Sequence, residues 1–255
     1  MIIIILILAL ILIVGLILLI KNSLVNKNTL WNFKHCNVIV AGKKGSGKDL
    51  LFQWVINKRK DYYYSNISYG RKHKIISLKD VSCMPNTYYT LINDKVEKQP
   101  HLFKEKKDIY ISDIGNFLPS YMDSTLYKYF PSMPLYYSLS RHLYNNNVHC
   151  NTQNIERGWK ALREQADFYI QVKRTYKLGF LMITKYYSYD NYESAKRRIL
   201  PIKTRLLNKY SKAEVDKYRA ENGEIQKGYI IQFKWNLYYN TRAFEKILLK
   251  GKRKH

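Results

Sequence analysis

The residues from Gly42 to Asp49 read GKKGSGKD and match the spacing of a phosphate-binding loop, G-x-x-x-x-G-K-[ST], except at the last position. Glycines in such a loop let backbone N–H groups turn inward around nucleotide phosphates, and the lysine adds a positive charge. Asp49 replaces the hydroxyl residue that usually holds magnesium. We therefore predict a site for ATP and Mg²⁺ that consists of Gly42, Lys43, Lys44, Gly45, Ser46, Gly47, Lys48, Asp49 and Leu50.

The segments on either side of this loop predict the elements that must position it. HCNVIVAG, before the loop, is a short apolar run that is typical of a buried strand. KDLLFQWVINKRK, after the loop, has apolar residues at helical spacing on one face. A strand, a loop and a helix in this order are the context that phosphate binding requires, because the helix N-terminus adds the positive end of its dipole.

A second carboxylate follows another apolar run. Residues Ile109 to Ile111 predict a strand that leads to Asp113, where nucleotide-binding sheets usually present a carboxylate that organises the metal. We expect Asp113 and Asp49 to hold the same metal ion, since carboxylate oxygens suit Mg²⁺. The next residue is Ile114 instead of the usual glutamate that positions the attacking water. The sequence therefore leaves open whether nucleotide binding leads to hydrolysis.

Alternating strands and helices continue along the chain. VHCNTQ and DFYIQVKR predict two further strands, separated by a helix over residues 155–164, and a helix is also expected over 135–144. A short helix is expected over 88–94. Ligands in parallel sheets lie beyond the carboxyl ends of the strands, so Gln153, Asp113 and the loop should meet at one edge. The predicted fold is α/β, with a mostly parallel sheet flanked by helices.

The N-terminus begins with an apolar run, IIIILILALILIVGLILLI, over residues 2–20. A helix of this length would span the hydrocarbon core of a bilayer, which is about 30 Å thick. Lys21, Lys27 and Lys34 follow the run and no charged side chain precedes it, which predicts a single-pass anchor with the N-terminus outside. The expected domains are an anchor at 1–21, a linker at 22–34 and a P-loop ATPase domain at 35–255 with a C-terminal β/α extension.

The composition is strongly basic, with 44 Lys and Arg residues against 19 Asp and Glu residues and a formal net charge of +25. Such an excess indicates a polyanionic partner, although an A/T-rich gene would also enrich the chain in lysine. Aromatic residues alternate with Lys and Arg in the C-terminal part. This pattern is compatible with a surface that binds single strands and with ordinary core positions.

The order of these motifs resembles the zonula-occludens-toxin-like assembly ATPases of filamentous phages, within the FtsK/HerA superfamily of P-loop motors. The resemblance covers residues 36–244. It rests on the motifs AGKKGSGKD, YYYSNISYG, IYISDIGNFLP, SRHLYNNNVHCNTQ, GWKALREQADFYIQVKR and LYYNTRAF. It implies a DNA-translocating ATPase of the host inner membrane. This enzyme would extrude a single-stranded phage genome, and its partners would be phage coat proteins and envelope secretion proteins.

The resemblance also implies a homo-oligomeric ring, in which an arginine of one subunit completes the site of the next. Arg163 best fits that position and Arg157 is the second candidate, while Gln153 corresponds to the polar sensor near the γ-phosphate. The family usually carries its membrane segment after the ATPase domain, whereas the apolar run comes first here, as in conjugative DNA-coupling proteins.

Two further alternatives remain open at this point. The missing glutamate after Asp113 would suit an assembly scaffold that binds nucleotide and does not hydrolyse it. The loop sequence also resembles that of some phage nucleoside monophosphate kinases, which have Asp at its last position.

Overall fold

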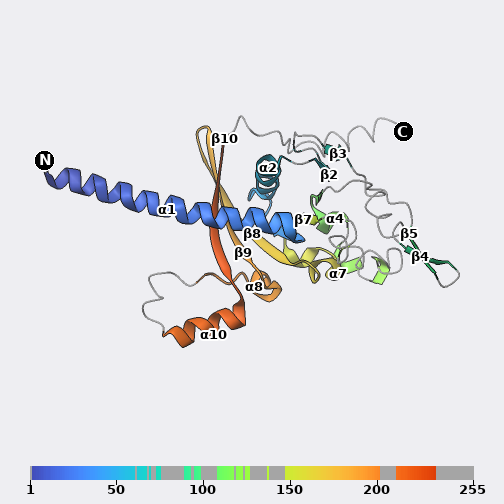
Figure 1. The fold of residues 1–255 in the computed structure, drawn as a ribbon. Helices are drawn as coiled ribbons and strands as arrows, with labels where there is room; N and C mark the ends of the chain where they lie inside the picture. Colours follow the sequence, from blue (N-terminus) through green and yellow to red (C-terminus); the bar gives the residue numbers. More distant parts are fainter. Residues whose placement is uncertain are drawn as a thin grey trace.

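A computed structural model of the chain describes residues 2–60, 62–67, 69, 73–75, 89–92, 95–98, 108–117, 119–122, 124–126, 137, 147–201 and 211–233. Its centre is a sheet of eight strands in the order β10-β9-β8-β1-β7-β6-β2-β3 (Figure 1). These strands are β1 (Val38–Ala41), β2 (Tyr63–Ser65), β3 (His73–Ile75), β6 (Ile109–Ile111), β7 (Val148–Thr152), β8 (Phe168–Leu178), β9 (Leu181–Tyr189) and β10 (Ile225–Phe233).

The strands from β8 to β3 are parallel, and β9 and β10 continue the sheet in antiparallel orientation. β1 lies between β7 and β8, and its four residues, VIVA, are all buried. Such an apolar, β-branched run is suited to a strand that is covered on both faces. Ala41 is level with Thr152 of β7, so the loop after β1 and the residues after β7 lie at one edge of the sheet. The predicted α/β fold with a mostly parallel sheet is confirmed.

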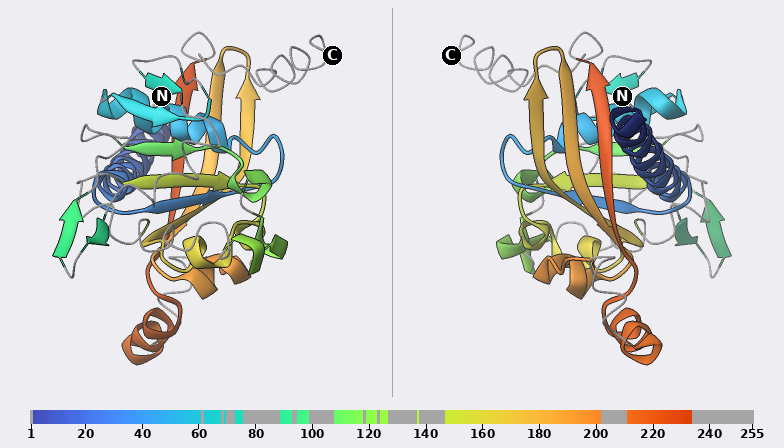
Figure 2. Two further views of the ribbon diagram at one scale, coloured as in Figure 1. Left: turned by 90° about the vertical axis from the view of Figure 1, so that its right-hand side faces the viewer. Right: turned by 90° about the vertical axis from the view of Figure 1, so that its left-hand side faces the viewer.

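Helices cover both faces of this sheet (Figure 2). One apolar cluster joins a face of the sheet to α1 (Ile2–His35) and α2 (Lys48–Arg59), and it contains Phe33, Leu51 and Val55, each fully buried. The cluster on the other face includes Trp159 and contacts shorter elements. These elements are α4 (Ile114–Phe117), the 3₁₀ turn η3 (Ile155–Arg157), α7 (Lys160–Arg163) and α8 (Tyr192–Arg197).

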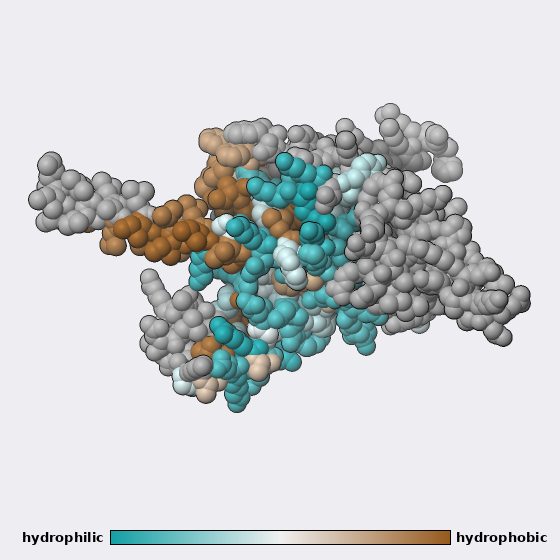
Figure 3. Space-filling model, in the orientation of Figure 1, coloured by the Kyte–Doolittle hydropathy of each residue, from teal (hydrophilic) through white to brown (hydrophobic). Residues whose placement is uncertain are grey.

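α1 is one continuous helix, and its second half docks on the sheet by polar contacts. The amide groups of Asn22 and Asn26 each donate a hydrogen bond of 3.0 Å to the backbone oxygen of Tyr229 in β10. Thr29 lies 2.9 Å from the hydroxyl of Tyr186 in β9. Residues 22–34, expected as a linker, are therefore helical and part of the folded body. The preceding apolar part of α1 projects from this body, and Leu18 is 62% exposed (Figure 3).

The predicted membrane anchor requires a correction. Among the residues that the structure describes, no helix is both long enough and apolar enough to cross a membrane. This finding overturns the expected single-pass topology in the host inner membrane, with residues 1–21 as the anchor and the N-terminus outside. The helix that contains the apolar run does not end there, since it continues to His35 through the polar segment that contacts β9 and β10.

Several smaller predictions also differ from the structure. Residues 88–94 were expected to be helical but contain β4 (Tyr89–Ile92), which pairs with β5 (Lys95–Lys98) in an antiparallel hairpin. The helix expected over residues 155–164 is divided into η3 and α7, because Gly158 between them is extended. Apart from residue 137, the helix expected over 135–144 lies outside the described residues, as does the LYYNTRAF motif.

The C-terminal extension of the sheet is a long antiparallel hairpin, β8–β9, followed by β10 at the outer side (Figure 1). A further helix, α10 (Lys212–Asn222), precedes β10. Ser211 and Glu214 form a reciprocal capping box at its N-terminus, which satisfies backbone donors that the helix leaves free.

Candidate nucleotide site

The loop between β1 and α2 has the backbone geometry that its glycines predict. Gly42 N donates to the Thr152 carbonyl at 3.1 Å, which fixes the start of the loop on β7. Gly45 and Gly47 adopt positive φ values of 75° and 103°, which residues with a Cβ rarely adopt. A Cβ on Gly47 would also lie 2.1 Å from Thr175 Oγ1 of β8, so this position requires glycine for space as well.

α2 begins directly after the loop, and no side chain caps its first turn. Gly47 is the N-cap residue and provides no side-chain hydrogen bond, so the first backbone N–H groups of the helix remain available for an anion. Lys48 is buried, with 6% exposure, whereas Lys43, Lys44 and Gly45 are exposed. This arrangement matches a phosphate cradle that has one internal lysine and an open rim.

Asp49 lies at the centre of a hydrogen-bond network. Its Oδ1 accepts from Asn151 Nδ2 at 2.8 Å, Ser112 Oγ at 3.0 Å and the Tyr69 hydroxyl at 3.1 Å. These donors are neutral, so they orient the carboxylate without adding a positive charge. The contacts join the first turn of α2 to the ends of β6 and β7. Asp49 therefore has one oxygen engaged by its own chain, while Oδ2 is available to a metal.

The same network fixes the backbone that carries Asp113. Ser112 N donates to Asn66 Oδ1 and Asp113 N donates to Asn151 Oδ1, each at 2.8 Å. Asp113 has a left-handed backbone, with φ of 53°, which a short polar residue tolerates better than most. The two asparagines thus fix the turn of the backbone after β6, from which the Asp113 side chain extends.

Asp113 lies in a mixed electrostatic environment. Burial raises the pKa of its carboxyl, the nearby Lys48 ammonium opposes this change, and Asp49 adds to it. A divalent cation between the two aspartates would remove their mutual repulsion, and Mg²⁺ commonly takes one or two carboxylates together with phosphate oxygens. Nowhere in the described ranges do three or more His, Cys, Asp or Glu residues gather at metal-binding distance. The two aspartates fit Mg²⁺ that is held jointly with a nucleotide.

Ile114 occupies the position of the usual glutamate and points into the protein core. It is 3% exposed and belongs to the apolar cluster that contains Ile155 and Trp159. Because this side chain is packed among apolar groups, it does not interact with a water molecule in the site. No carboxylate takes its place at this position.

The other predicted site residues lie after β7. Gln153 is half-buried and accepts a hydrogen bond of 3.2 Å from Arg157, whose side chain is exposed. Arg163 is half-buried, donates to the Glu156 carbonyl of its own chain, and lies 5.9 Å from the Tyr192 ring centroid. The structure therefore groups Gln153 with Arg157, while Arg163 is held by contacts within its own subunit.

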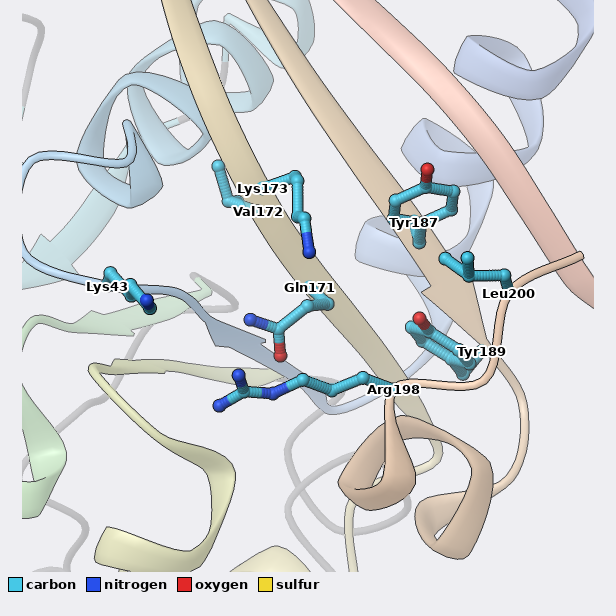
Figure 4. A pocket seen from close by; sticks show the side chains of 8 residues that line it. All are labelled: Lys43, Gln171, Val172, Lys173, Tyr187, Tyr189, Arg198 and Leu200. Carbon is cyan, nitrogen blue, oxygen red and sulfur yellow. The ribbon is translucent and has the colours of Figure 1, made fainter.

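A small basic cavity of about 130 Å³ lies beside the loop (Figure 4). Lys43, Lys173 and Arg198 extend towards Gln171 from three different segments, and Tyr187 and Tyr189 form the opposite wall. None of the described residues that line this cavity is acidic. Its charge suits an anionic group close to the loop.

Sequence reasoning missed the residues that organise the two aspartates. Asn151 is two residues before the predicted Gln153, and its side chain lies on the strand face opposite to that of Thr152. The order Ser112-Asp113 and the asparagine-rich strand ends were visible in the sequence. However, the contacts of Asn66 and Tyr69 depend on how β2 and the following residues pack beside β6. The sequence does not encode these contacts locally.

The position of β7 between the loop strand and β6, together with the geometry of the loop, defines a P-loop NTPase fold. No family model matches the sequence, and no curated protein matches it.

Solved structures similar to this one include the N-terminal domain of zonular occludens toxin from Neisseria meningitidis. Its identity is 13% and its TM-score 0.44, with 69% of this chain and 100% of that chain covered. The genome packaging NTPase B204 from Sulfolobus turreted icosahedral virus 2, in complex with AMPPCP, gives 16% identity, coverage of 64% and 94%, and a TM-score of 0.39. The ATPase DotB from Legionella pneumophila has 11% identity and a TM-score of 0.33, with 88% of this chain and 63% of that chain covered. The first is of the kind that the sequence motifs resemble.

Proposed function

We propose that the protein is a P-loop ATPase that moves DNA during virion assembly. The observation that carries this proposal is the convergence of three features at one edge of the parallel sheet. They are a glycine loop with a buried Lys48, the carboxylate of Asp49 held by neutral donors, and Asp113 beside both. This arrangement is suited to a magnesium-bound triphosphate.

In the proposed site, the loop from Gly42 to Leu50 surrounds the phosphates with backbone N–H groups, and Lys48 contacts their oxygens. Asp49 and Asp113 would hold Mg²⁺, directly or through water. The metal would neutralise charge that develops on the transferred phosphoryl group. The left-handed backbone at Asp113 and the donors to Asp49 keep both carboxylates oriented before the nucleotide binds.

The hydrolytic step in this proposal uses residues after β7. Gln153 is the polar side chain that contacts the γ-phosphate or the attacking water, and an arginine from a neighbouring subunit of a ring stabilises the developing charge. Arg157 suits this second role better than Arg163, because Arg157 is exposed, although its hydrogen bond to Gln153 of its own subunit would have to break. Arg163 would first have to leave the Glu156 carbonyl.

DNA is the proposed macromolecular partner, and the net charge of +25 supports a polyanion. A single-stranded phage genome is the substrate that we propose, with coat and envelope secretion proteins as assembly partners. These assignments come from the sequence motifs and the charge.

The test is an ATPase assay on the full-length protein, with and without single-stranded DNA, and with MgCl₂. We expect Lys48→Ala to abolish hydrolysis and to weaken the binding of a fluorescent ATP analogue. Lys58→Ala is the matched control, because Lys58 is an exposed lysine on the same helix. Absence of any nucleotide binding in the unmodified protein would exclude the proposal.

One observation favours a second candidate, a scaffold that binds nucleotide without hydrolysing it. Ile114 is buried in the core where a catalytic glutamate would be expected, and removal of a water-positioning group usually lowers rates by orders of magnitude. This candidate predicts nucleotide binding that depends on Lys48 and shows no phosphate release. Hydrolysis that disappears in Lys48→Ala would eliminate it.

A further inference from the structure

The antiparallel strands β8, β9 and β10 carry positive charge without any negative charge. Within their bounds they contain five Lys and Arg residues and no Asp or Glu: Lys173, Arg174, Lys177, Lys185 and Lys227. None of the five forms an ion pair with a described residue. Exposed cations are either solvated or bound by an anionic ligand, and an excess of one sign on a surface suits a partner of the opposite charge.

The register of the strands brings three of these cations together on one face. Arg174 of β8 is directly opposite Lys185 of β9, and Lys185 is directly opposite Tyr229 of β10. Lys227 is opposite Tyr187, one step along the same face. Like charges directly opposite each other destabilise a sheet. A bound anion would relieve the repulsion between Arg174 and Lys185.

Tyrosine rings accompany these cations. Arg174 lies 5.4 Å from the ring centroid of Tyr176, Lys185 is 5.4 Å from that of Tyr187, and Lys227 is 5.0 Å from that of Tyr229. Tyr187 is part of the core, but Tyr176 is 43% exposed. Hydrogen bonding to the Tyr187 side chain raises the pKa of Lys185, so its amine stays charged at neutral pH. Positive groups beside an accessible ring, here Tyr176, are typical of surfaces on which bases stack.

The opposite face of the same strands is already occupied. Tyr186 and Ile230 are fully buried in the cluster that includes Phe33 of α1 and Val55 of α2. On this side, Thr175 donates a hydrogen bond of 2.8 Å to the Ser46 carbonyl of the phosphate loop. Arg174 and Tyr176 therefore flank a residue that touches the nucleotide site, and the basic cavity beside the loop continues the charged face through Tyr187.

We propose that the outward face of β8, β9 and β10 binds single-stranded nucleic acid, with Arg174, Lys185 and Lys227 on its phosphates and Tyr176 stacked on a base. The inference deepens the proposed function, which names DNA as the partner, by assigning the surface that holds the strand. The occupant follows from charge complementarity and from the exposed ring, since a polyanion without bases would make no use of Tyr176.

The experiment measures fluorescence anisotropy of a labelled oligodeoxythymidylate with the full-length protein over a range of salt concentrations. We expect the triple variant Arg174→Gln, Lys185→Gln, Lys227→Gln to bind about 10- to 100-fold more weakly at 0.1 M salt. Its log–log salt slope should be about 2 units shallower, because each single-strand phosphate contact contributes about 0.7. The matched control, Lys58→Gln, Lys217→Gln, Arg219→Gln, changes the same charge on other exposed helical surfaces.

Tyr176→Leu isolates the stacking contribution. We expect it to weaken oligonucleotide binding by about 5-fold or more without changing the salt slope, and to leave heparin binding unaffected. Oligouridylate in the same assay distinguishes RNA from DNA as the natural strand. Equal affinity of the triple variant and its control would overturn the proposal, as would a Tyr176→Leu protein that binds the strand as tightly as the unmodified protein.

Failure of this inference can be separated from failure of the proposed function. The triple variant should bind a fluorescent ATP analogue with unchanged affinity, whereas Lys48→Ala should lose nucleotide affinity and keep oligonucleotide binding. Loss of nucleotide binding in the triple variant would indicate misfolding. Circular dichroism would then test whether the triple variant is folded. The decisive measurement would be strand binding by single-site variants at Arg174 and Lys185, each of which we expect to bind several-fold more weakly.

Discussion

Two carboxylates, the half-buried Asp49 and the buried Asp108, lie at opposite ends of the strands β6 and β7, and their surroundings differ. Asp49, at the carboxyl ends, accepts hydrogen bonds from three neutral donors, Asn151, Ser112 and Tyr69. Asp108, directly before β6, forms an ion pair with Arg59 and lies 3.6 Å from His149. The donors to the first carboxylate are uncharged, whereas a guanidinium pairs with the second.

This difference suits Asp49 to the proposed metal site and Asp108 to a structural contact. Asp108 also accepts from Asn147 N, and Arg59 donates to the Phe33 carbonyl, so this cluster joins α1, α2 and the sheet. Contact with His149 and Arg59 lowers the pKa of Asp108 despite its burial, while burial lowers the pKa of His149. Both shifts favour the fold at neutral pH and are lost as the pH falls. Among the described residues Asp49 has no ion-pair partner, which suits it to a cation from outside the chain.

The largest effect is expected from breaking the structural cluster. Arg59→Met leaves the Asp108 charge buried without its guanidinium, and removal of one partner of a buried pair typically costs about 3–5 kcal/mol. Urea unfolding at pH 7 measures this loss. Lys58→Met, at the exposed neighbouring position, should change stability by less than about 0.5 kcal/mol. A similar small loss in Arg59→Met would show that Asp108 does not depend on the ion pair.

A smaller effect on stability and a larger one on ligand binding are expected at Asn151. Asn151→Leu removes the donor to Asp49 and the acceptor for Asp113 N, which should cost about 1–3 kcal/mol. Mutation of a group that orients a metal ligand usually lowers metal affinity or activity about 10- to 100-fold. Nucleotide affinity in MgCl₂ should therefore fall by about that factor. Titration with a fluorescent ATP analogue, with Asn154→Ala as the control, tests this. Unchanged affinity would mean that the network is structural only.

Substitution of Asp49 is expected to change the metal preference of the site more than its affinity for nucleotide. Asp49→Ser restores the usual hydroxyl and leaves the loop glycines and Lys48 intact, so the nucleotide should still bind. The preference between Mg²⁺ and Mn²⁺ should shift by about 10-fold, since a hydroxyl and a carboxylate differ in charge as ligands. Nucleotide titrations in each metal measure the ratio. Complete loss of binding would contradict the assignment of the phosphates to backbone N–H groups and Lys48.

The smallest effect is the pH dependence of stability. Its sign at Asp113, after β6, is opposite to that at Asp108, before β6, because the pKa of Asp113 is raised and that of Asp108 is lowered. Burial raises the pKa of Asp113, so its ionised form disfavours the fold, and this penalty appears as the pH rises through the raised pKa. Asp113→Asn should therefore stabilise the ligand-free protein at pH 7, by less than about 1 kcal/mol because solvent screens the group, and the gain should vanish near pH 4. Asparagine also tolerates the left-handed backbone. Destabilisation at pH 7 would show that Lys48 outweighs burial.

The sequence predicts the parts of this molecule that depend on local patterns. The strand at residues 109–111, the glycine loop and the helix after it follow from apolar periodicity and from glycine spacing, and the structure contains all three. Asn66 and Tyr69 could not be assigned in this way, because their partners, Ser112 and Asp49, are distant in the chain. The ion pair of Arg59 with Asp108 is equally non-local.

The N-terminal helix shows how a local pattern can mislead. The apolar run and the lysines after it predict an anchor followed by a linker, so Asn22 and Asn26 are expected in that linker. Their role depends on β10, which is about two hundred positions away in the sequence, and no helical or strand periodicity encodes that contact. The alternation of Tyr with Lys and Arg was equally ambiguous, because burial divides the tyrosines between core and surface.

The docking of α1 on β10 has a practical consequence for the outer border of the sheet. β10 is the last strand on that side, and an uncovered strand edge is a template for pairing with another copy of the chain. The asparagine side chains occupy the backbone N–H and C=O groups of Tyr229 and so interrupt that template. A protein shortened to begin near residue 30 would lose this protection. Its self-association in gel filtration would then reflect strand-to-strand aggregation instead of the assembly of a ring.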